Sequence, residues 1–293
     1  MKASTLREHR RLANDALYRI YRHIDSDLNL DLLAKDLGVS RHHLQRLFLE
    51  QTGSNLYETI RSIRLQKAAS LLLSNRHATV SEIAGLCGYG SQTSFIRAFS
   101  SRYGMTPGEW RRGGYRRYVR KNLGNLPKKE DLEKRFGDLE PRLVRRASMP
   151  AYYIRHRGYD PKELRRIWQR LWAWLEHYGI ERYRLVGLYH DNPLITPLEE
   201  CSYIAAAVTE ERPPRGEALP EFEIPGGLYA VFTLEGRTGE MLELMQWIHH
   251  IWLPDSGYET TPMPAYSLFE RHHLLHEDQE SFLVHYHLPV RVV

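Results

Sequence analysis

The sequence predicts a multidomain protein, in which an all-α tandem helix-turn-helix domain is followed by an α+β domain of two βαββ repeats. Two internal repeats and an uneven distribution of charge lead to this prediction. We place the helical domain at residues 1–112, a linker at 113–140 and the α+β domain at 141–293. With 293 residues and 42% apolar content, the chain is long enough to form two cores.

The first predicted element is an amphipathic helix over residues 6–24, whose apolar side chains recur every three or four positions. A short apolar-patterned helix follows at 30–37, then a tight turn at Gly38 and a second helix capped by Ser40. In this second helix Leu44, Leu47 and Phe48 share one face, which predicts a helix-turn-helix packed on 30–37. The first helix is expected to brace this unit.

The outer face of the second helix consists of side chains that can donate hydrogen bonds to base edges: Arg41, His42, Gln45 and Arg46. A capped amphipathic helix with a polar outer face is more often plain structure. The assignment to DNA therefore needs an independent observation, and a repeat of the pattern provides it.

The helix-turn-helix pattern occurs again about fifty residues later. The matching pairs are Leu33 and Ile83, Ala34 and Ala84, Leu37 and Cys87, Gly38 and Gly88, Ser40 and Ser91, Leu44 and Phe95, Arg46 and Arg97, Phe48 and Phe99, Gly53 and Gly104. Between the copies lies a predicted helix over 56–74, about 25 to 28 Å long at 1.5 Å per residue. Two such helices on one spacer could enter successive major-groove segments, about 34 Å apart, with some bending of the DNA and without a dimer.

Charge is distributed unevenly along the chain. Residues 1–120 hold twenty Lys and Arg against ten Asp and Glu, whereas residues 121–293 hold twenty-one against twenty-six. This asymmetry predicts a module that binds a polyanion, joined to a second module with another role. The basic run Arg111–Arg120 fits an extra phosphate contact or a plain tether equally well.

In the C-terminal half, a strand, a helix and two strands recur at a shift of seventy-eight residues. Gly158 matches Gly236, Trp174 matches Trp252 and Gly179 matches Gly257. Two such units can pair into one antiparallel sheet covered by two helices, and the groove between the helices is a natural pocket.

Both halves resemble known families. HLQRLF at 43–48, IRLQKAASLL at 63–72 and GYGSQTSFIRAFSSRYGMTPGEWRR at 88–112 resemble the DNA-binding domain of AraC/XylS-family regulators, closest to the MarA, SoxS and Rob group. This likeness covers about residues 6–112. YHDNPLITP at 189–197, IPGGLYAVFTLEG at 224–236 and DSGYETTPMPAYSLF at 255–269 resemble the GyrI-like small-molecule-sensing domain, and the two together have the layout of Rob.

The first resemblance implies that Arg41, His42, Gln45 and Arg46 contact one groove segment, and that Gln92, Thr93, Ile96 and Arg97 contact the next. It implies double-stranded promoter DNA and RNA polymerase as partners. His42 stands where this group usually carries tryptophan, and Ile96 where threonine is common. We therefore expect a different target sequence.

The second resemblance implies a small-molecule effector. The side chains that we place near its pocket are Tyr153, Trp168, Trp172, Tyr189, Tyr229, Trp247, Ser267 and Phe269. Several members bind cationic planar compounds through a buried glutamate, and that position is Ser267 here. Glu270 should face the other side of the strand. We therefore expect an uncharged ligand compatible with aromatic contacts, or else a protein partner.

Other functions find little support in the sequence. No nucleophile elbow, phosphate loop, HExxH or paired CxxC occurs, so we expect no catalytic residues, metal or cofactor. Hydrolysis of a small electrophile, known for some GyrI-like proteins, is expected to need the glutamate that Ser267 replaces. Cys87 and Cys201 are expected to be buried free thiols. Without a signal peptide or a long apolar run, the chain is expected to be cytoplasmic, without membrane contact.

Overall fold

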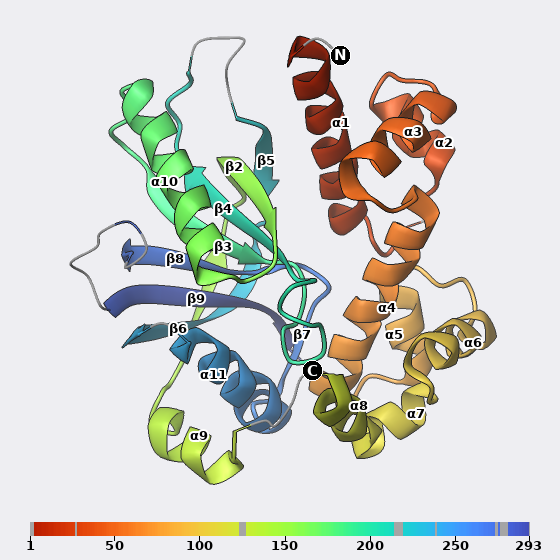
Figure 1. The fold of residues 1–293 in the computed structure, drawn as a ribbon. Coiled ribbons are helices and arrows are strands. Elements are labelled where there is room, and N and C mark those ends of the chain that lie inside the picture. Colours follow the sequence, from red (N-terminus) through yellow and green to blue (C-terminus); the bar gives the residue numbers. More distant parts are fainter. Residues whose placement is uncertain are drawn as a thin grey trace. The chain divides into compact units, whose positions relative to one another are not determined.

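A computed structural model describes residues 3–26, 28–122, 127–213, 219–237, 239–272, 275 and 281–292. The chain forms two compact units. The first comprises Met1–Leu72 and Ala78–Arg112, and the second comprises Leu73–His77 and Gly113–Val293. The first unit is helical, and the second is built on an antiparallel sheet (Figure 1).

The helices of the first unit follow the predicted order. They are α1 (Ala3–Arg22), α2 (Leu30–Asp36), α3 (Arg41–Thr52), α4 (Leu56–Ser74), α5 (Val80–Leu86), α6 (Gln92–Tyr103), α7 (Pro107–Glu109) and the kinked turn η1 (Trp110–Gly114). Helix α4 has the predicted bounds and runs from the group of α1, α2 and α3 to the group of α5 and α6 (Figure 1). The structure therefore contains two helix-turn-helix units joined by one helix.

The two units share the local features that fix such a turn. Ser40 and Ser91 cap α3 and α6, each accepting a hydrogen bond of 3.2 Å from the backbone N–H three residues on. In the turns, Gly38 and Gly88 have φ of 67° and 71°, a conformation that costs other residues about 1 kcal/mol or more. The repeat in the sequence is thus a repeat in backbone geometry.

The second helices are held by buried apolar side chains. Leu44, Leu47 and Phe48 of α3 are fully buried and pack in one cluster with Leu33 and Ala34 of α2. In the second copy, the buried rings are Phe95, Phe99, Tyr103 and Trp110. The Trp110 indole N–H donates to the carbonyl oxygen of Ala69 on α4 at 3.1 Å, which anchors the end of this unit to the spacer helix.

The second unit is built on one antiparallel sheet with the strand order β1-β6-β9-β8-β3-β4-β2-β5, in which β7 also pairs with β9. Its strands are β1 (Arg142–Arg146), β2 (Met149–Arg157), β3 (Arg184–Tyr189), β4 (Ser202–Val208), β5 (Glu221–Ile224), β6 (Gly227–Arg237), β7 (Tyr258–Thr260), β8 (Ala265–Arg271) and β9 (Ser281–Val292). The chain visits β2, α10, β3 and β4, and later β6, α11, β8 and β9. The interpretation of these series as two repeats stays a prediction.

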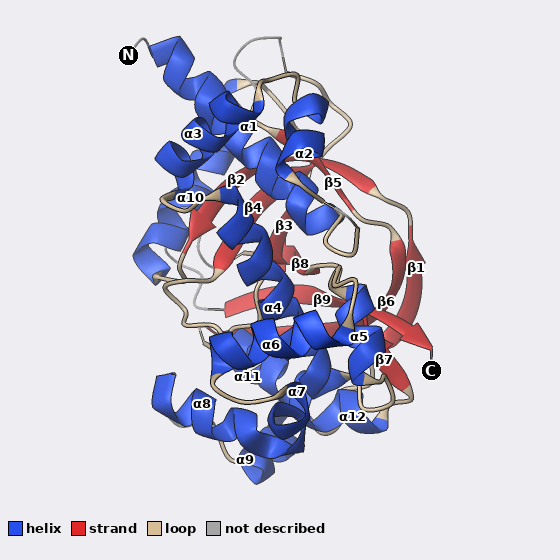
Figure 2. Ribbon diagram, turned by 90° about the vertical axis from the view of Figure 1, so that its right-hand side faces the viewer, coloured by secondary structure: helices blue, strands red, loops and turns tan. Residues whose placement is uncertain are grey.

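The second unit also contains helices, which are blue in Figure 2. They are α8 (Tyr115–Asn122), α9 (Lys129–Phe136), α10 (Pro161–His177), α11 (Glu240–Trp247), the π-helical turn η2 (Ile248–Trp252) and α12 (Leu253–Asp255). Helix α10 packs on β2 and β4, and α11 packs on β6 and β9, so that each helix has its own apolar core. This arrangement is an α+β layer.

Residues 113–140, predicted as a linker, contain helices α8 and α9, which the sequence analysis did not anticipate. Leu132 and Phe136, one helical turn apart, are buried in the α11 core, and Val119 is buried too. Two apolar residues in a short, highly charged helix do not form an apolar pattern long enough to be recognised as helical from the sequence.

The short segment 73–77, which includes the last two residues of α4, belongs to the second unit, although it lies between the two helix-turn-helix units in the sequence. The Asn75 side chain is fully buried there. Its amide donates to the carbonyl oxygen of Thr260 at 2.9 Å and accepts from the Thr260 backbone N–H at 3.0 Å. The Asn75 side chain thus pairs with the Thr260 backbone as the backbone of a neighbouring strand would.

No helix in the described residues is both long and apolar enough to cross a membrane.

Candidate nucleic-acid interface and ligand pocket

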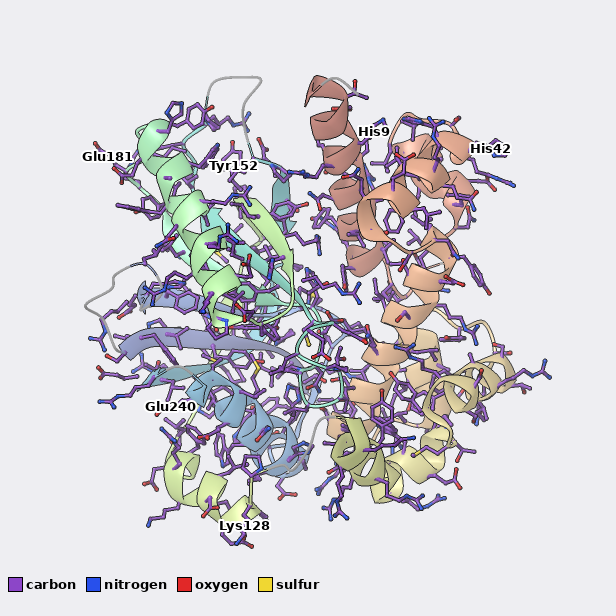
Figure 3. All side chains as sticks on the ribbon, in the orientation of Figure 1. His9, His42, Lys128, Tyr152, Glu181 and Glu240 are labelled. Atoms are coloured by element: carbon purple, nitrogen blue, oxygen red, sulfur yellow. The ribbon has the colours of Figure 1, made fainter. Side chains whose placement is uncertain are left out.

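The four side chains predicted to contact DNA from α3 all lie at the surface. Arg41, His42, Gln45 and Arg46 are exposed, and His42 points away from the helices beneath it (Figure 3). Arg46 Nε lies 4.0 Å from Glu50 Oε1, in a pair whose side chains are 69% and 48% exposed. Such surface pairs contribute about 0 to 1 kcal/mol, so the arginine is available to a stronger anion.

The corresponding face of α6 has the same character. Gln92, Thr93 and Arg97 are exposed, and Ile96 is half-buried at the edge of this face. In both helices the inner face is closed by core packing, and the outer face presents hydrogen-bond donors. Contact of these residues with bases stays a prediction.

The second unit contains a cavity of about 250 Å³ between the two covering helices and the sheet. It is lined by Tyr159, Pro161, Leu164, Tyr189, Pro193, Leu198, Tyr203, Gly239, Met241, Leu242, Met245, Phe269, His272 and Phe282. None of these described lining residues is an acid, a lysine or an arginine. The surface that a ligand would meet is aromatic and aliphatic, with a few hydroxyl groups.

Three tyrosines supply these hydroxyls. Tyr203 Oη accepts from the Trp168 indole N–H at 3.2 Å, and Tyr189 Oη lies 3.0 Å from Ser267 Oγ. The Tyr159 hydroxyl is buried and has no hydrogen-bond partner among the described residues. Burial raises the pKa of Tyr189 to about 12, and it raises the pKa values of Tyr159 and Tyr203 well above their usual range. All three hydroxyls therefore keep their protons and are neutral at physiological pH.

Gly187, which has no side chain, leaves space for two aromatic rings of the pocket wall. A Cβ atom on Gly187 of β3 would lie 2.4 Å from Tyr203 Oη and 3.2 Å from a ring carbon of Phe269. The backbone of β3 therefore lets two aromatic rings from neighbouring strands lie over it.

Of the eight predicted pocket residues, Tyr189 and Phe269 line this cavity and the other six do not. Ser267 and Trp168 lie directly behind the wall, bonded to Tyr189 and Tyr203. Trp172 is 42% exposed on the outer side of α10, and Trp247 is buried in the core with Phe232.

Tyr153 and Tyr229 lie away from the cavity because side chains alternate between the two faces of a strand. Ile154 on β2 and Phe232 on β6 pack under the helices, and side chains alternate along a strand. Tyr153 and Tyr229 therefore point to the opposite face, where Tyr153 packs on Phe222. The Tyr229 hydroxyl donates to the carbonyl oxygen of Pro225 at 2.6 Å.

The residues that sequence reasoning missed carry a signal that could have been used. In the strand SYIAAAV the large Tyr203 alternates with the small Ala205 and Ala207, all buried under α10. This pattern identifies the strand face that is covered by a helix, and the small alanines indicate unfilled space on that face. Tyr159, by contrast, lies in a loop, and its position could not be inferred from strand alternation.

Glu270, as expected, faces away from the pocket. It is exposed at an irregularity in the pairing of β8 with β9 and lies 2.6 Å from His285 Nε2. Cys87 and Cys201 are buried and free, in agreement with the sequence. Among the described residues, no group of three His, Cys, Asp or Glu side chains could hold a metal ion.

Comparison with known proteins assigns both units. A model of the helix-turn-helix domain matches residues 33–113, and a model of the GyrI-like small molecule binding domain matches residues 139–291, just over half of the chain. The regulatory protein SoxS of Escherichia coli is 37% identical over 103 residues, which cover 35% of this chain and 95% of SoxS. The chain belongs to the AraC family of transcription regulators and carries a GyrI-like domain.

Two further similar proteins each match about a third of this AraC-family chain. The xylose operon regulatory protein of Escherichia coli is 33% identical over 96 residues, 33% of this chain, but the match spans only 24% of that protein. The C-terminal domain of AraT, a response regulator from Geobacillus stearothermophilus, is 34% identical and has a TM-score of 0.34, with 34% of this chain and 84% of that chain covered. The pocket lies in the part that matches the GyrI-like model.

Proposed function

We propose that this AraC-family regulator binds promoter DNA with α3 and α6 in two successive major-groove segments, and that a small uncharged aromatic ligand in the GyrI-like pocket adjusts this binding. The observation that carries the ligand class is the pocket wall, whose described residues hold aromatic rings and tyrosine hydroxyls but no carboxylate.

The proposal for DNA rests on the matched geometry of the two helix-turn-helix units. Both second helices have a serine cap, a buried apolar face and an exposed arginine at matching positions, Arg46 and Arg97. Arginine binds guanine in the major groove through two hydrogen bonds, which contribute about 1 to 3 kcal/mol of discrimination. The excess of basic residues over 1–120 would add phosphate contacts and a steep salt dependence.

The proposal for the ligand rests on desolvation. A cation entering an apolar cavity loses its hydration, at a cost of several kcal/mol unless a buried anion compensates. At the position where relatives that bind cations are expected to carry glutamate, this chain has the fully buried Ser267. A neutral ligand would instead use the Tyr159 hydroxyl, which has no partner among the described residues, and the aromatic surface of Tyr189 and Phe269.

A test uses the full chain with a neutral fluorophore, N-phenyl-1-naphthylamine, and a planar cation, ethidium. Leu164→Trp replaces an aliphatic side chain of the pocket wall with a bulky indole ring, and Leu143→Trp, on the exposed strand β1, is its matched control. We expect the neutral probe to bind the parent and the control, and its affinity to fall by about tenfold or more in Leu164→Trp. Preferential binding of ethidium, or an equal effect of both tryptophans, would contradict the proposal.

RNA polymerase as a partner, and protein recognition or hydrolysis of a small electrophile as alternatives for the GyrI-like domain, stay predictions. Retention of a macromolecule by the purified protein without any added compound would favour the interaction alternative. Turnover of an electrophilic ester would favour the hydrolase.

A further inference from the structure

The second unit contains a second cavity that differs from the ligand pocket in chemistry. It has a volume of about 520 Å³ and lies between α8, the beginning of α9 and the end of α11 with the turn η2. It is lined by Tyr115, Arg116, Val119, Arg120, Pro127, Lys128, Lys129, Leu132, Gln246, His250 and Ile251.

Positive charge dominates this cavity. Arg116 and Arg120, one helical turn apart on α8, face Lys128 and Lys129 at the beginning of α9, and no described lining residue is acidic. Lys128, labelled in Figure 3, is the residue that directly precedes α9. Lys129 Nζ lies 3.6 Å from Glu133 Oε1, in a surface pair with side chains 65% and 48% exposed. Four cations around one cavity repel each other, and an anion would relieve this repulsion.

The base of the cavity is apolar and contains two buried polar atoms without a hydrogen-bond partner among the described residues. Val119 and Leu132 are buried, and the Tyr115 ring stacks on the His250 ring with 5.6 Å between centroids and 9° between planes. Gln246 is only 7% exposed, and its Oε1 has no partner among the described residues; the same holds for His250 Nε2. Burial, aided by Arg116, lowers the pKa of His250 to about 4, so its ring is neutral at pH 7.

These features define one class of ligand. Cations at the rim suit an acidic group, and the apolar walls suit a hydrocarbon or aromatic frame. The buried amide oxygen of Gln246 suits a hydroxyl or N–H donor. We propose that this cavity is a second effector site, which binds a small organic anion with an apolar frame and a hydrogen-bond donor. The site is distinct from the neutral pocket, with which it shares no lining residue.

A matched pair of probes tests this proposal in the full chain. 8-Anilino-1-naphthalenesulfonate has the required anion, rings and N–H donor, and N-phenyl-1-naphthylamine is the same framework without the sulfonate. The variant Arg116→Gln/Arg120→Gln removes two charges from the cavity. Its control is Arg117→Gln, because Arg117 lies on the same helix, is exposed and does not line the cavity.

We expect the double variant to weaken binding of the sulfonate by about tenfold, and Arg117→Gln to change it by less than about twofold. Leu164→Trp should leave the sulfonate affinity unchanged, while the double variant should leave the affinity for the neutral probe unchanged. Failure at one site is therefore distinguishable from failure at the other.

Two results would overturn the proposal. One is an equal loss of sulfonate binding in Arg117→Gln and in the double variant, which would reduce the effect to overall charge. The other is an unchanged sulfonate affinity together with weaker binding of random duplex DNA in the double variant, which would assign these arginines to DNA phosphates.

Discussion

Tyr189 Oη on β3 lies 3.0 Å from Ser267 Oγ on the neighbouring strand β8, and Ser267 is fully buried. This hydrogen bond ties a pocket tyrosine to the position where relatives that bind cations are expected to carry a carboxylate. The pocket wall is therefore neutral at this point, and the polar group behind it is already satisfied.

Ser267→Glu should change the neutral pocket wall into a negatively charged one. The buried carboxylate would lower the free energy of unfolding by a few kcal/mol, because little there compensates its desolvation. The same charge should favour a planar cation, so ethidium should bind more tightly and N-phenyl-1-naphthylamine more weakly. Urea unfolding and fluorescence titration measure both effects, with Ser267→Ala as the control for the lost hydrogen bond. A variant that folds yet gains no affinity for ethidium would disagree with this account of the pocket.

Tyr159→Phe should separate stability from binding. The hydroxyl has no partner among the described residues, so its removal should leave the free energy of unfolding unchanged or raise it by up to about 1 kcal/mol. Affinity for a ligand with a hydrogen-bonding group should nevertheless fall by about fivefold. Tyr203→Phe, which loses the bond from Trp168, should lower stability instead. If Tyr159→Phe destabilises the protein as much as Tyr203→Phe, the hydroxyl is not reserved for a ligand.

His287→Phe should reduce the loss of stability in acid. Burial lowers the pKa of His287 to about 4, against the opposing effect of its hydrogen bond to the His285 carbonyl and with smaller contributions from Arg146, His285 and Arg184. In the unfolded chain the pKa is near its ordinary value of 6.5. The unfolded state therefore binds the extra proton first, and stability is full above pH 6.5 and falls as the pH drops toward 4. Between pH 7.5 and 5 this histidine should account for about 2 kcal/mol.

Phenylalanine keeps the ring that stacks on Tyr266, with 4.3 Å between centroids, but cannot take up a proton. It also loses the hydrogen bond to the carbonyl oxygen of His285, so the variant should be less stable at pH 7.5 but less sensitive to acid. Urea unfolding at both pH values checks this. His250 should leave some pH dependence in the variant, and an undiminished dependence would show that His287 is not responsible.

Asn75→Ala should affect both stability and regulation. Three hydrogen bonds join Asn75 to Thr260, and removal of the side chain leaves a buried backbone N–H without its partner, at a cost of about 2 to 4 kcal/mol. Because residue 75 lies between the two helix-turn-helix units in the sequence, we expect the variant to weaken the effect of a pocket ligand on DNA affinity. Arg76→Gln, which loses only an exposed pair with Asp255, is the control in thermal melting and DNA titration. Equal coupling in both variants would exclude this segment from signal transfer.

Sequence patterns predicted the helical unit well because its determinants are local. Serine caps, positive-φ glycines and apolar spacing act within a few residues, and α4 has the predicted bounds Leu56–Ser74. The pocket depends on register between distant strands, as in the contact of Gly187 with the Tyr203 ring. Aromatic content alone could not distinguish Tyr189, on the covered face, from Tyr153 on the other. Nor could it show that Leu132 and Phe136 join the second core.

The measurement that tests the central claim most directly is the affinity of Arg46→Ala and Arg97→Ala for a duplex carrying the specific promoter site and for random duplex DNA at one salt concentration. Each substitution should cost about 1 to 3 kcal/mol on the specific site and much less on random DNA. Both helices would then contribute to sequence recognition. Equal losses on the two duplexes, or an effect of only one arginine, would contradict the claim that α3 and α6 both contact bases.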